Sequence, residues 1–153
     1  MQPRNLLARS IDNTYRGHKL ALWLFALVVS VRIFQSILVI FNGYSTVTKA
    51  DGIPLDTYPA AAAQTVVSLF ALYALSRLLI ALLCALVLVR YRSAIPFMFA
   101  LLLVNYLAVQ VLLLFVPLVR TGTPPASIVN RILIAVTVAG LALSLWPSSG
   151  RQE

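Results

Sequence analysis

The chain has 153 residues, of which 61% are hydrophobic and 10% are charged, whereas a typical soluble domain carries about 25% charged residues. Its formal net charge is +8, but the basic residues are spread out and mostly flank apolar blocks instead of forming a run that would bind nucleic acid. This composition excludes an ordinary soluble domain, so we expect membrane lipids and no nucleic acid as partners.

The chain offers few residues for metal, redox or cofactor chemistry. Its single cysteine, Cys84, lies inside an apolar run, which excludes a disulfide framework and a paired-thiol redox site within one chain. Its single histidine, His18, has no second histidine or carboxylate nearby in sequence with which to hold a metal. We therefore expect no metal site and no cofactor.

The N-terminal segment and the first apolar block come first in chain order. Residues 1–19 are polar and basic, and their spacing of Leu and Ile side chains is typical of a short interfacial helix on the cytoplasmic surface. The apolar block at about 20–41 is longer than the core of a signal peptide, and at 1.5 Å per residue it can cross a hydrocarbon layer of roughly 30 Å. We expect it to be retained as the first span.

The longest loop and the second span follow. Residues 42–59 contain the turn signal Asp51-Gly52, and Asp56 or Thr57 is expected to cap the helix that starts near Pro59. The second span, at about 60–89, is longer than a bilayer requires, which indicates that it tilts or projects at its outer end.

The second half of the chain repeats this pattern. A very short basic link joins the second span to a third at about 94–119, so these two spans are expected to be antiparallel neighbours. Ser127 is expected to cap a fourth span at about 128–146, with 148–153 as a tail. The pair Gly140 and Ser144 has the small-xxx-small spacing that lets helices approach closely, either within the chain or in a homo-oligomer.

Orientation is predicted from the basic residues outside the spans. Seven lie on one side if the N terminus is inside, and three lie on the other: Arg4, Arg9, Arg16, Lys19, Arg90, Arg92 and Arg151 against Lys49, Arg120 and Arg131. The predicted fold is therefore an all-α membrane protein, an antiparallel bundle of four transmembrane helices with both ends in the cytoplasm. Ten of the twelve basic residues are arginine, which we interpret as a bacterial usage and hence a bacterial plasma membrane.

A polar layer is predicted near the middle of the membrane. Arg32 and Arg77 each lie about twelve residues from the cytoplasmic end of their spans, roughly 18 Å deep, where a charged side chain is costly and usually faces the bundle interior or marks a pathway. Neighbouring positions on the same helix faces, or at similar depth on the third span, add hydrogen-bonding groups. The candidate ligand-binding residues are Arg32, Gln35, Ser36, Tyr73, Arg77, Asn105, Tyr106 and Gln110.

None of the spans contains Asp or Glu, so three interpretations of the layer stay open. In the first, amides, carbonyls and water satisfy the arginines, or the arginines reach toward the headgroups, and the layer is structural. In the second, the layer binds an anionic group, since guanidinium donors match carboxylate and phosphate shapes. In the third, Asp51 or Asp56 folds inward from the outer loop as a counter-ion, and the loop becomes a lid.

These interpretations give two leading functions. The first is a non-catalytic membrane protein that binds a lipid-like or anionic ligand, or serves as an accessory subunit of a membrane-protein partner. The second is a small anion or metabolite transporter or channel that uses Arg32 and Arg77 for selection. An enzyme ranks third, because the sequence contains no visible nucleophile–base pair or metal cluster.

Overall fold

The computed structural model describes residues 13, 15 and 17–146. In this part of the chain all regular structure is helical. The interfacial helix predicted for residues 1–19 and the tail at 148–153 lie almost wholly outside the described residues. The helices are α1 (Lys19–Phe41), α2 (Gly43–Lys49), η1 (Leu55–Thr57), α3 (Ala60–Arg90), η2 (Arg92–Ala94), α4 (Ile95–Phe115) and α5 (Pro125–Leu145).

Four segments are long and apolar enough to cross a membrane. They carry at most two charged residues in an 18-residue window, and most of each window lies on the surface of the chain, where large apolar side chains are exposed. Such an apolar surface is unsuited to water and indicates an integral membrane protein. The four segments are Lys19–Phe41, Ala60–Arg90, Arg92–Phe115 and Pro125–Leu145.

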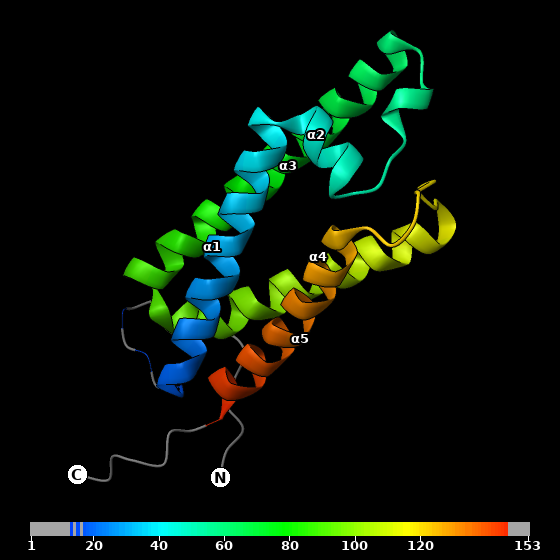
Figure 1. Ribbon diagram of the computed structural model, residues 1–153. Coiled ribbons are helices and arrows are strands. Elements are labelled where there is room, and N and C mark those ends of the chain that lie inside the picture. Colours follow the sequence, from blue (N-terminus) through cyan, green and yellow to red (C-terminus); the bar gives the residue numbers. More distant parts are fainter. Residues whose placement is uncertain (1–12, 14, 16, 147–153) are drawn as a thin grey trace, which may run out of the picture.

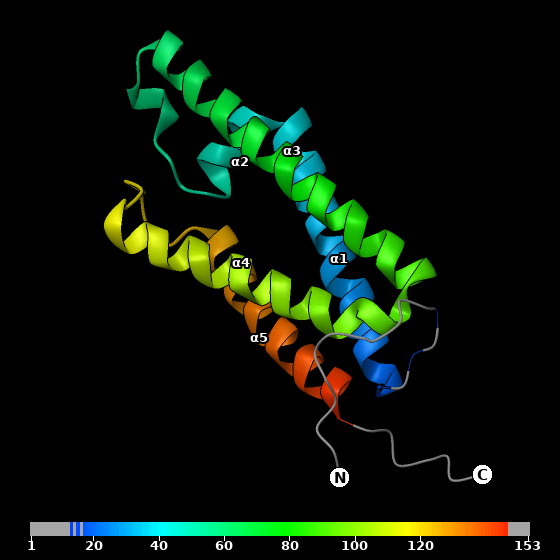
Figure 2. The same ribbon diagram turned by 180° about the vertical axis from the view of Figure 1, so that it is seen from behind.

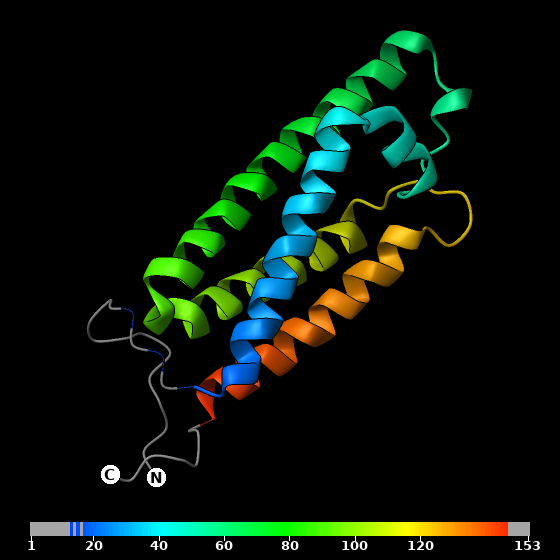
Figure 3. The same cartoon turned by 60° about the vertical axis from the view of Figure 1, so that its left-hand side comes forward.

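The long helices form two pairs that diverge like the arms of a V. Helix α1 packs along α3 and also against α5, while α4 packs along α5. Helices α3 and α4, although joined by the short link through η2, contact each other only sparsely and move apart from that link (Figures 1 and 2). Figure 3 shows α1 between α3 and α5. The result is a bundle that is tight at one end and open at the other.

We call the tight end the hairpin side and the open end the loop side. On the hairpin side, the backbone N–H of His18 donates to the carbonyl of Leu143 at 3.3 Å, so the start of α1 lies beside the end of α5. On the loop side, Thr121 N–H donates to the carbonyl of Gly52 at 2.7 Å and Ala126 N–H to that of Ala50 at 3.1 Å. The 42–59 and 116–124 connections are therefore tied together across the open end.

The hydrophobic core fills the hairpin side. Phe25 of α1 and Phe99 of α4 are fully buried and meet edge to face, with 4.9 Å between ring centroids. Gly140 of α5 lies so close to the Phe99 ring that a Cβ atom there would collide with it. Gly140 and Ser144 are both buried within this chain, so their small-residue spacing serves contacts between its own helices.

The 42–59 segment is more ordered than a simple loop, because it contains α2 and η1 around a small second core of Val47, Ile53 and Leu55. Helix α3 begins after Pro59 without a side-chain cap, so the expected capping by Asp56 or Thr57 is wrong. The Thr57 hydroxyl instead donates to the carbonyl of Pro54 at 2.8 Å. Gly52 has φ +72°, the left-handed conformation that an Asp-Gly turn favours.

Candidate functional site

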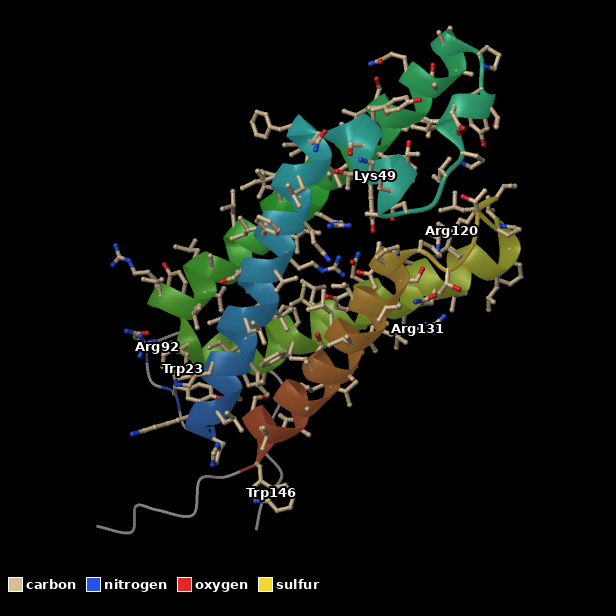
Figure 4. All side chains as sticks on the ribbon, viewed as in Figure 1. Trp23, Lys49, Arg92, Arg120, Arg131 and Trp146 are labelled. Carbon is tan, nitrogen blue, oxygen red and sulfur yellow. The ribbon has the colours of Figure 1, made fainter. Side chains whose placement is uncertain are left out.

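A cavity of about 420 Å³ lies between the arms of the V. Its lining comes from α1, α3, α4 and α5 and from both loop-side connections. Four arginines and one carboxylate are among the lining residues, which leaves an excess of three positive charges when the carboxylate is ionised. Figure 4 shows Lys49, Arg120 and Arg131 on the loop-side half of the molecule, and Trp23, Arg92 and Trp146 on the hairpin side. The charged lining residues are Arg32, Arg77, Arg120, Arg131 and Asp51.

Three of these arginines lie at similar depth on three different helices. Arg32 follows the start of α1 by 13 residues, and Arg77 precedes the end of α3 by 13, which places each about 20 Å from the hairpin side. Arg131 precedes the end of α5 by 14 residues, or about 21 Å. Arg131 therefore belongs inside the fourth apolar helix and not in the outer loop, where the charge count had placed it.

Arg32 is the best-satisfied member of the group. It is 9% exposed, and its Nε donates a hydrogen bond to the Tyr106 hydroxyl at 2.8 Å. The guanidinium carbon lies 4.1 Å from the centroid of the same ring, a distance at which the negative face of the ring attracts a cation. Ser36 fixes the local backbone, because its hydroxyl donates to the Arg32 carbonyl at 2.8 Å. Arg32 thus links α1 to α4 at the inner end of the cavity.

Arg77 is held much more loosely. Its Nη2 donates to Gln35 Oε1 at 3.4 Å, near the upper limit for a hydrogen bond, and its guanidinium carbon lies 5.6 Å from the Tyr73 ring. Its Nε is buried and has no hydrogen-bond partner among the described residues. An unpaired charged donor is costly in a protein interior, so Arg77 retains unused capacity to bind an acceptor.

The loop-side part of the cavity also contains buried hydrogen-bonding groups that lack a partner. Arg120 Nη1 donates to the Ser127 hydroxyl at 3.1 Å, while its buried Nε has no partner in residues 17–146. The carbonyl oxygen of the Asn130 side chain, also in the lining, is likewise buried and unpartnered in that range. Ser127 lies within the first turn of α5, so its hydroxyl holds Arg120 and does not cap the helix as expected.

Among the described residues, Asp51 is the only carboxylate in the cavity lining. Burial raises the pKa of its carboxyl group, and the positive charges of Arg120 and Arg77 oppose part of that rise. Asp51 therefore lies within electrostatic reach of one arginine on the loop side and one at mid-depth. Asp56, the other outer-loop candidate, is exposed in η1 and does not line the cavity.

The structure brings together most of the residues that the sequence nominated. Arg32, Tyr73, Arg77, Asn105, Tyr106 and Gln110 all line the cavity, and Asp51 joins them. Gln35 and Ser36 act behind the lining by bonding to Arg77 and to the Arg32 backbone.

Four polar lining residues were missed by sequence reasoning. Counting residues from the end of the fourth apolar helix at 1.5 Å each, as for Arg32 and Arg77, could have found Arg131 and its neighbour Asn130. The positions of Arg120 and Ser127 depend on how the 116–124 connection folds back over α5, for which the sequence holds no signal. The four missed residues are Arg120, Ser127, Asn130 and Arg131.

The lining of this cavity combines positively charged hydrogen-bond donors with an apolar wall. Guanidinium, amide and hydroxyl groups supply donors, and leucine, valine and phenylalanine side chains supply the remaining surface. In the described part of the chain no three histidine, cysteine or acidic side chains gather as metal ligands. Comparison of the chain with protein-family models, with curated proteins and with solved structures finds no match, so this interpretation depends on the residues themselves.

Proposed function

We propose that this membrane protein is non-catalytic and binds an anionic, lipid-like ligand in the cavity between its helix pairs. The observation that carries the proposal is the convergence of four arginines on one cavity that has a single carboxylate in its lining. Charged side chains at membrane depth are expensive and normally face an internal partner or a polar pathway. Here the carboxylates of the chain are too few to balance them, and an anionic ligand would.

The unused hydrogen-bonding groups support the same conclusion. Arg77 Nε and Arg120 Nε are buried donors without a partner among the described residues. A phosphate or carboxylate accepts several such bonds at once, and charge-assisted bonds of this kind are about twice as strong as neutral ones. A purely structural polar layer would be expected to satisfy its own donors, as Arg32 does with Tyr106.

The proposal includes a topology and a location. We infer an antiparallel four-helix bundle with both ends in the cytoplasm, in a bacterial plasma membrane. With Arg131 placed in a span, the count of flanking basic residues becomes seven against two, Lys49 and Arg120. The exposed Trp23 and Trp146 on the hairpin side suit a membrane interface. The cavity would then open toward the exterior half of the bilayer.

A small anion or metabolite transporter or channel is the second candidate, favoured by the mid-depth position of Arg32 and Arg77. Against it, the fully buried Phe25 and Phe99 fill the space between the cavity and the hairpin side. Transport would require these rings to separate, whereas binding requires no such motion. An accessory role beside a membrane-protein partner, or in a homo-oligomer, is compatible with binding in the cavity.

The binding proposal can be tested with one matched pair of variants on α3. The full chain is purified in detergent, and lipids that remain bound are identified and counted by native mass spectrometry. Arg77→Gln should lose most of the bound anionic lipid, while Arg90→Gln should retain it, because Arg90 is exposed at the hairpin-side end of the same helix. Equal retention by the two variants would rule out the cavity as the binding site.

A further inference from the structure

The geometry points to a phosphate-bearing membrane amphiphile that enters the cavity sideways from the bilayer, through the opening between α3 and α4. This inference rests on the proposed function and specifies the class and the source of its ligand. The phosphate would lie between Arg77 at mid-depth and Arg120 on the loop side, and the acyl chains would stay in the lipid beside the opening.

The first support is the way the helices enclose the cavity. Helix α1 packs along α3, α5 packs along α1, and α4 packs along α5, so three of the four helix junctions are closed. The α3–α4 junction is different, because these helices contact sparsely and diverge from the link at η2 (Figure 2). The cavity therefore has a wall on three sides and an opening toward the lipid on the fourth.

The second support is the apolar character of the edges of this opening. Leu69 of α3 and Leu112 of α4 line the cavity, yet they are 60% and 58% exposed. Tyr73 stands beside Leu69 on the same edge, with its ring toward Arg77 and a substantial part of its surface exposed. Leucine edges beside a guanidinium suit a molecule that has both a hydrocarbon chain and an anionic head.

The third support is the closure of the loop side. Gly52 and Ala50 accept hydrogen bonds from Thr121 and Ala126, and the Thr121 hydroxyl adds a second bond to Gly52 at 3.1 Å. This strap, residues 50–52 with 121–126, ties the ends of both arms together where water would otherwise reach the arginines. A ligand from the bilayer avoids the strap, whereas a soluble anion has to pass it.

The size of the cavity agrees with a headgroup and not with a whole lipid. A volume of about 420 Å³ falls in the lower half of the range of small-molecule sites, about 300–1,000 Å³. It accommodates a glycerol phosphate with the start of its chains. Asn105 and Gln110 of α4 provide amides in the lining for hydroxyl groups beside the phosphate.

The source of the ligand is tested by comparing a lipid with its isolated headgroup. The full chain in nanodiscs of phosphatidylcholine is titrated with phosphatidylglycerol, and separately with glycerophosphoglycerol, which lacks the acyl chains. We expect saturable binding of phosphatidylglycerol and at least a tenfold weaker response to the free headgroup at equal concentration. Equal binding of the headgroup, reduced alike by Arg77→Gln, would overturn the lipid source and leave the anion site standing. Binding of neither anion would overturn both proposals.

The route is tested with two pairs of leucine variants. Leu69→Trp and Leu112→Trp enlarge side chains at the opening, while Leu72→Trp and Leu114→Trp enlarge leucines on the same helices that are exposed but lie outside the lining. The first two variants should slow the exchange of phosphatidylglycerol at least several-fold, and the second two should leave it unchanged. If all four variants exchange lipid at the wild-type rate, the ligand does not pass between α3 and α4.

Discussion

The hydrogen bond from Arg32 to Tyr106 gives a prediction that can be worked out from the structure. Tyr106→Phe removes the oxygen that accepts from Arg32 Nε at 2.8 Å, yet it keeps the ring 4.1 Å from the guanidinium. Hydrogen bonds between membrane helices contribute about 0.6 kcal/mol on average, and a charged donor roughly doubles such a contribution. Arg32 also loses its acceptor in a site where it is only 9% exposed. We expect Tyr106→Phe to lower the free energy of unfolding by about 1–2 kcal/mol.

The buried cysteine provides the assay. Cys84 is 1% exposed, so a dye that fluoresces on reacting with thiols reports unfolding of the detergent-solubilised chain on heating. Tyr73→Phe is the matched control, because its ring is 5.6 Å from Arg77 and its hydroxyl forms no hydrogen bond within the described residues. The control should change stability by less than about 0.5 kcal/mol. Equal losses in the two variants would refute the role assigned to the Tyr106 hydroxyl.

Three further predictions concern packing, charge and topology. Gly140→Ala should destabilise the chain by about 1–3 kcal/mol in the same thiol assay, because the Cβ of the new alanine would collide with the Phe99 ring. Ala139→Val, on the exposed face of α5, should leave the stability unchanged. Burial raises the pKa of Asp51 above its ordinary 3.8, so the folded state holds this proton more tightly than the unfolded state. Stability should therefore fall as the pH rises from 3.8 through the folded-state pKa, and affinity for phosphatidylglycerol should fall with it as the carboxylate forms. Asp51→Asn should remove the pH dependence of both the stability and the lipid affinity over this range. The variant should also bind phosphatidylglycerol several-fold more tightly than the wild type near neutral pH. An unaltered pH dependence of either quantity would contradict this account. In a Cys84→Ala background, a membrane-impermeant maleimide added to intact cells should label Lys49→Cys and spare Arg92→Cys, and the reverse pattern would overturn the proposed orientation.

The spans could be predicted from the sequence because a bilayer imposes a single strong requirement on each of them. The first span was expected at about 20–41, and the helix runs over Lys19–Phe41. The short Arg90–Ser93 link predicted α3 and α4 as antiparallel neighbours, whereas these two helices contact each other only sparsely. Length and hydropathy are properties of a segment alone, so no knowledge of the other segments was needed.

The splay of the helices could not be predicted in this way. Nothing in the pattern of α3 or α4 indicates that they separate, because both are apolar on nearly every face. The separation follows from which pairs pack best, and that depends on contacts such as Gly140 against Phe99. For the same reason the sequence suggested a polar layer but not a cavity, and it gave Arg120 no place in the site.

The positions of the mid-depth arginines have a consequence for the synthesis of this protein. Arg32, Arg77 and Arg131 lie on three separate helices, so each of these helices carries one guanidinium at mid-depth when it enters the membrane. On insertion scales such a group costs about 2.5–3.5 kcal/mol, which a strongly apolar segment tolerates singly. Assembly then brings the three side chains to the lining of one cavity, where Arg32 is buried, Arg77 is half-buried and Arg131 stays exposed. Newly inserted helices therefore gain by bringing each guanidinium to a polar partner on another helix, as Arg32 does with Tyr106 and Arg77 with Gln35, although the like charges of the arginines repel one another.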